Sequence, residues 1–150
     1  MAFKYVFSRP EAAICPLIRF IYPRNQTEFF ILPNRHMNLS NPIPLPFTSE
    51  SFVRLLQYGA NPNESPYSHK QIAEWCDKFW CRYIDIDIPA EIEAILPILT
   101  DVETQWDLHL ANTFTVEQLR CDSFEVERMP VEWFNDWLDQ VLKLKTKINS

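Results

Sequence analysis

The first part of the chain carries the pattern of half-buried β-strands. Residues 3–7 alternate large aromatic side chains with other types, and residues 14–22 are rich in aromatic and β-branched types. Residues 23–26 (Pro-Arg-Asn-Gln) form a turn signal, and residues 27–32 resume the strand pattern. We therefore expect a hairpin of antiparallel strands here, followed by a proline-rich extended loop over residues 33–46.

From residue 48 onward the apolar positions recur at the three- and four-residue spacing of amphipathic helices. Thr48 or Ser49 can cap the first helix by accepting an amide hydrogen bond, and Gly59 is expected to close it in the left-handed conformation. Ser68 is the expected cap of a second helix. Its apolar positions share one face and are Ile72, Trp75, Cys76, Phe79 and Tyr83.

The stretch that follows mixes the two patterns. Residues 84–88 (Ile-Asp-Ile-Asp-Ile) alternate and predict a short strand. A helix is predicted over residues 90–96, and Pro97 should kink or end it. The pair Thr100 and Glu103 has capping-box spacing, so a fresh helix is predicted over about residues 101–111.

The last part of the chain predicts two further helices and one more strand. Thr115 and Gln118 repeat the capping-box spacing before a short helix. Residues 124–127 (Phe-Glu-Val-Glu) alternate as a strand does. A final helix is expected after Pro130, with lysines near its end, where cations favour the helix dipole.

Strands first and helices later predict the α+β class. We expect a small N-terminal antiparallel sheet packed against four to six C-terminal helices, in a single α+β domain of residues 1–150. The length of 150 residues is typical of one domain and is enough to bury a core.

Glycine and charge narrow the function classes. The chain has one glycine, Gly59, so it cannot build a phosphate-binding loop, a dinucleotide fingerprint or a nucleophile elbow, all of which need several. The formal net charge is −6 and is unevenly spread. Residues 1–70 hold seven basic and four acidic side chains, whereas residues 71–150 hold seven and sixteen. An acidic surface repels nucleic acid and anionic membrane and attracts basic partners.

Cysteine usage and the apolar runs indicate a cytoplasmic protein. The start of the chain lacks the apolar stretch of a signal peptide, and no run approaches the ~20 residues that span a bilayer. The four cysteines are then expected as thiols of a reducing compartment. His69, Cys76 and Cys81 form only half of a structural zinc pattern, so no metal and no cofactor are expected.

The leading functional hypothesis is a small acidic protein-binding module without catalysis. Residues 74–107 hold nine acidic and two basic side chains, interleaved with aromatic ones. Aromatic anchors and charge complementarity are the elements of a protein interface. An inhibitor or immunity-type protein for a basic partner is the sharpest form of this hypothesis. The residues predicted to bind the partner are Trp80, Asp85, Asp87, Glu91, Glu93 and Trp106.

Two alternatives stay open. The first is a metal- or carboxylate-dependent enzyme that uses Asp85, Asp87, Asp107 and His109, because paired carboxylates bind divalent metals or divide acid and base roles. The second is an accessory subunit of a stable complex, which would expose an apolar patch when alone. Nucleic acid and membrane are not expected as partners, and the sequence leaves self-association open.

Overall fold

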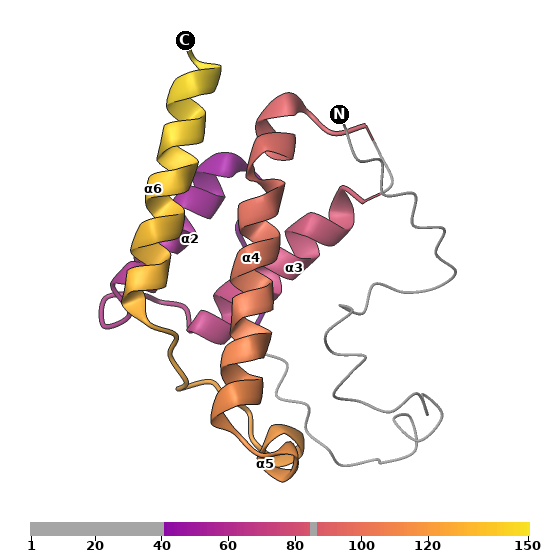
Figure 1. The fold of residues 1–150 in the computed structure, drawn as a ribbon, viewed down its shortest axis with the longest axis vertical. Coiled ribbons are helices and arrows are strands. Elements are labelled where there is room, and N and C mark those ends of the chain that lie inside the picture. Colours follow the sequence, from indigo (N-terminus) through magenta and orange to yellow (C-terminus); the bar gives the residue numbers. More distant parts are fainter. Residues whose placement is uncertain (1–40, 85–86) are drawn as a thin grey trace.

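The computed structural model describes residues 41–84 and 87–150 and shows five helices there. They are α2 (Ser49–Ala60), α3 (His69–Arg82), α4 (Ala90–Thr113), α5 (Val116–Cys121) and α6 (Val131–Ile148). Within these ranges 69% of the residues are helical and none is in a strand. The α+β prediction is therefore wrong for the described part of the chain, which is all-helical (Figure 1). The segments assigned to the N-terminal sheet, residues 3–7, 14–22 and 27–32, lie outside it.

Neither of the two short strands predicted farther along is present in the residues that the structure describes. Ile84 lies in a turn, and the described residues of 87–89 have no regular structure. Residues 124–127 form a turn instead, in which the Glu127 amide donates to the Phe124 carbonyl at 3.2 Å. Alternation predicts a strand only where a second strand can pair with it, and the helices leave no such partner in the described chain.

The predicted helix starts are confirmed at three capping residues. The side chains of Thr48, Ser68 and Thr115 each accept a backbone amide of the following turn. Gln71 and Gln118 complete two capping boxes by reaching back to the amides of Ser68 and Thr115. These contacts are local, and the spacing that produces them can be read directly from the sequence.

Pro97 was predicted to kink or end its helix, and it does not end it, so the fresh helix predicted over about residues 101–111 is part of the same helix. Pro97 lies inside the 24-residue α4, which continues to Thr113. The predicted capping box at Thr100 is absent because this hydroxyl donates to the Leu96 carbonyl at 2.5 Å. Leu99 and Val102 are fully buried on either side of Thr100. Tertiary burial of this segment outweighs the intrinsic cost of proline in a helix.

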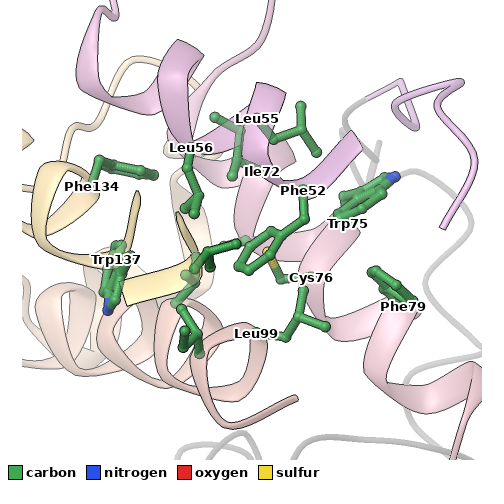
Figure 2. Packing of buried hydrophobic residues seen from close by; sticks show 14 of the residues in the cluster. Phe52, Leu55, Leu56, Ile72, Trp75, Cys76, Phe79, Leu99, Phe134 and Trp137 are labelled. Carbon is green, nitrogen blue, oxygen red and sulfur yellow. The ribbon is translucent and has the colours of Figure 1, made fainter. Parts of the chain in front are cut away.

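The helices pack in pairs around one core. The first described helix, α2, packs mainly on the last, α6, while α3 packs mainly on α4. Contacts between α4 and α6 join the two pairs (Figure 1). Figure 2 shows the interior, where side chains from α2, α3, α4 and α6 meet. Its fully buried members include Phe52, Leu56, Phe79, Leu99 and Phe134. Residues 41–48 cross α3, where the Trp75 indole donates to the Leu45 carbonyl at 3.2 Å.

Gly59 has a different role from the predicted one. The glycine has no positive φ and lies inside α2, whose C-cap is Asn61. A Cβ atom at this position would lie 2.1 Å from Cδ1 of Phe134 on α6. Glycine is needed here because the α2 backbone lies directly against the buried Phe134 ring.

Candidate functional site

The structure divides the residues predicted to bind a partner. Trp106 is 6% exposed and belongs to the core, so it is not available as an anchor. Trp80 is half-buried on α3, and Asp85 lies outside the described residues. Asp87, Glu91 and Glu93 are exposed at or just before the start of α4.

The start of α4 is a place of mixed charge. Ser49, at the start of α2, donates a hydrogen bond to Glu91. Lys145, near the end of α6, lies with its Nζ 3.0 Å from Glu50 and 4.0 Å from Glu91. The pKa of Glu50 is lowered, mainly by a backbone hydrogen bond and next by the hydrogen bond from Lys145. Lys145 therefore offsets part of the negative charge of Glu50 and Glu91.

Asp87, Asp107 and His109 of the alternative enzyme do not form one site, and Asp85 lies outside the described residues. Asp87 precedes α4, whereas Asp107 and His109 lie near its end. A helical rise of 1.5 Å per residue separates Ala90 from Asp107 by about 25 Å. No group of three or more histidine, cysteine or carboxylate side chains in residues 41–84 and 87–150 could hold a metal ion.

The opposite end of the molecule brings two loops together. Residues 61–68 connect α2 to α3, and residues 122–130 connect α5 to α6 (Figure 1). His69 lies between the loops and is 1% exposed. Its Nδ1 accepts the Met129 amide at 2.9 Å, so its Nε2 carries the proton and donates to the Gly59 carbonyl at 2.9 Å. Burial lowers the pKa of this imidazole, which keeps the ring neutral and both hydrogen bonds intact.

Side chains of the second loop are held by partners distant in sequence. Glu125 accepts the Lys70 ammonium at 3.0 Å, and Glu127 pairs with the His109 imidazole at 2.7 Å. Arg128 donates to the Asn63 side chain at 3.1 Å. These three contacts attach the loop to α3, to α4 and to the neighbouring loop, so its backbone path is determined by long-range pairs.

The start and end of this loop are also fixed. The Phe124 ring packs on Phe114, with centroids 4.9 Å apart, and its backbone has a φ of 56°. Only glycine and a few polar residues adopt this left-handed backbone conformation at low cost, so the contacts around Phe124 must stabilise it. At the other end Met129 is 2% exposed and its amide donates to His69.

Val126 differs from its neighbours in this loop, because 92% of its surface is exposed. It borders a hollow of about 260 Å³ between the two loops. Residues that line the hollow include Tyr67, Ser68, Glu125, Glu127 and Arg128. The loop thus presents one apolar side chain on a rigid frame, next to a polar depression large enough for a single side chain of another molecule.

Sequence reasoning missed this loop. Its Phe-Glu-Val-Glu alternation favoured a strand, and the residues that hold it, Lys70, His109 and Asn63, lie 18 to 65 positions away.

The two histidines of this end are both engaged in hydrogen bonds. His69 uses both ring nitrogens in backbone hydrogen bonds, and Nε2 of His109 contacts Glu127. Burial raises the pKa of the Cys76 thiol well above its usual value, which keeps it protonated in the core.

Across the described ranges, no helix has both the length and the apolar character needed to cross a membrane. Comparisons with protein-family models, curated proteins and solved structures find no match for this chain.

Proposed function

We propose that the protein is a non-catalytic binding module for another protein with a basic surface. The charge of the helical body carries this proposal. Residues 41–84 and 87–150 hold seventeen acidic side chains and nine basic ones. A surface of this sign accelerates association with a cationic partner and opposes binding of nucleic acid. We expect the module to act in the cytoplasm, where its cysteines would stay reduced.

The outer face of α6 supports the proposal more strongly than the start of α4. Phe134, Trp137 and Val141 form the buried face of α6. Asp136 and Asp139 are exposed on the opposite face, in line with Glu132, because residues three and four apart share a helix face. We name these three residues the α6 acidic stripe. The next position in the stripe, Lys143, is basic and marks its end.

Asp101 of α4 adds an exposed carboxylate beside α6, on the side of Trp137 and away from the stripe. Its carboxylate accepts the Trp137 indole at 2.7 Å, which fixes Asp101 beside α6. The start of α4, by comparison, has Lys145 among its carboxylates. The α6 acidic stripe is therefore the surface on which we expect a basic partner to rest, and the exposed acids near the start of α4 are the alternative.

Two double variants test the proposal with equal changes in net charge. One reverses the stripe (Asp136→Lys with Asp139→Lys), and the other reverses the start of α4 (Asp87→Lys with Glu93→Lys). All four side chains are exposed, so both variants should fold. The partner is first identified by capture at low salt and is then purified, so that its affinity for each chain can be titrated.

We expect binding to weaken by about tenfold or more in the stripe variant, and by less in the variant at the start of α4. Affinity of the unmodified chain should also fall steeply between about 50 mM and 500 mM salt, because screening weakens exposed charge pairs. The reverse order of the two variants would move the interface to the start of α4. Salt-independent binding, unchanged in both variants, would overturn the proposal and favour the accessory subunit with an apolar interface.

A further inference from the structure

We propose that residues 124–129 form a docking loop and that Val126 is its anchor, which enters an apolar pocket on the partner. The inference rests on the proposed function for the class of partner, a protein with basic side chains. It goes further by assigning the contact to a loop that is separate from the α6 acidic stripe. Three observations carry it: the exposure of Val126, the rigid hold on the loop, and the charge around it.

Exposure of Val126 is much greater than that of the other large apolar residues on the described surface. Val126 is 92% exposed, whereas Leu108, Val116, Leu142 and Ile148 range from 38% to 48%. A single exposed apolar side chain is ordinary on a protein surface. This one lies at the tip of a loop whose other side chains are held, so it can be buried by a partner without any rearrangement.

Preorganisation is the second observation. Glu125 and Glu127, on either side of Val126, are held by Lys70 of α3 and His109 of α4. The φ of 56° at Phe124 shows that this path is imposed on the chain by those contacts. A loop already fixed in one conformation has little entropy left to lose when it binds, so more of the contact energy becomes affinity.

The charge around the loop defines the partner. Glu64, Asp122 and Glu132 are exposed on the segments that surround it. Arg128 is the basic residue of the loop; its guanidinium keeps its charge while it donates to the neutral Asn63 side chain, so the three exposed carboxylates outnumber it. The partner that fits is therefore a protein with an apolar pocket bordered by Lys or Arg.

The experiment uses a displayed library of random peptides, selected against the full chain, as a defined probe. An enriched sequence is synthesised, and its affinity is measured by fluorescence polarisation. Val126→Ser is compared with Val116→Ser, a matched change at a 48% exposed position on α5. Both positions are exposed, so neither change should unfold the protein, and circular dichroism checks this.

We expect peptides with an apolar residue next to Lys or Arg. Val126→Ser should weaken their binding by about tenfold to a hundredfold, the range that burial of one valine side chain supplies. Val116→Ser should leave it within about twofold. Basic peptides that bind Val126→Ser unchanged would overturn the docking loop and leave the proposed function standing. Failure to enrich any basic peptide would count against both.

Discussion

The close approach of Gly59 to Phe134 makes a prediction with an unusual sign. Gly59→Ala inside a helix would ordinarily stabilise a protein by about 0.5–1 kcal/mol, because alanine loses less backbone entropy on folding. Here the added Cβ would lie 2.1 Å from Cδ1 and 2.2 Å from Cε1 of Phe134. That ring is fully buried between α2 and α6, so it has no empty space to move into.

The expected cost follows from these two terms. Overpacking a full core by one methyl group typically costs about 1–3 kcal/mol. The contacts with Phe134 are ring atoms in the middle of the core, which places the cost in the upper part of that range. Subtracting the helix-propensity gain leaves a net destabilisation of about 1–2 kcal/mol. The thermal midpoint should then fall by about 2–8 °C for a chain of this size.

Urea unfolding followed by far-ultraviolet circular dichroism measures the effect in four proteins: the unmodified chain, Gly59→Ala, Phe134→Ala and the double variant. Without the ring, Gly59→Ala should recover its ordinary stabilising sign, giving a coupling energy of about 2 kcal/mol. Phe134→Ala alone should cost about 3–5 kcal/mol, and sucrose can restore enough stability to measure it. A stabilising or neutral Gly59→Ala in the unmodified background would refute the reasoning.

Three further predictions concern the local chemistry. Stability should fall below pH 6.5 by about 1.4 kcal/mol per pH unit, because the unfolded chain takes up a proton on His69 that the folded chain, with its lowered pKa, refuses. Urea midpoints at several pH values should show this slope, and His69→Gln should remove that part of it. Thr48→Ala should destabilise by about 0.5–2 kcal/mol through loss of the α2 cap, and an unchanged midpoint would contradict the cap. A thiol reagent read by mass spectrometry should label exposed Cys121 in the folded protein, and should label buried Cys76 only after unfolding; equal rates would contradict the burial.

Local signals explain which parts of the fold could be predicted. The starts of α2, α3 and α5 follow from a hydroxyl and an amide within the same helical turn, at Thr48, Ser68 and Thr115. The positions of Gly59 and Pro97 could not be interpreted in this way. What decides Gly59 is a ring 75 positions away, and what keeps Pro97 helical is the burial of Leu99 and Val102.

The candidate site shows the same limit more strongly. Acidic and aromatic residues between 74 and 107 predicted one binding face, but folding turned Trp106 into the core and brought Lys145 close to Glu91. Periodicity does assign Asp136 and Asp139 to the outer face of α6, so the stripe was accessible to sequence reasoning. The docking loop was not, since the contacts of Glu125 with Lys70 and of Arg128 with Asn63 join segments far apart in the chain.

The pairing of α2 with α6 also determines how the protein must be made. Phe52, Leu55 and Leu56 of α2 leave the ribosome long before α6, whose first residue follows the end of α2 by about 70 positions. At translation rates of about 5–20 residues per second, α2 waits on the order of 4–14 s for the helix with which it mainly packs. A nascent chain in that interval is a substrate for chaperones. A ribosome that pauses before α6 would prolong the exposure of these apolar side chains of α2, and the incomplete chain could then aggregate through them.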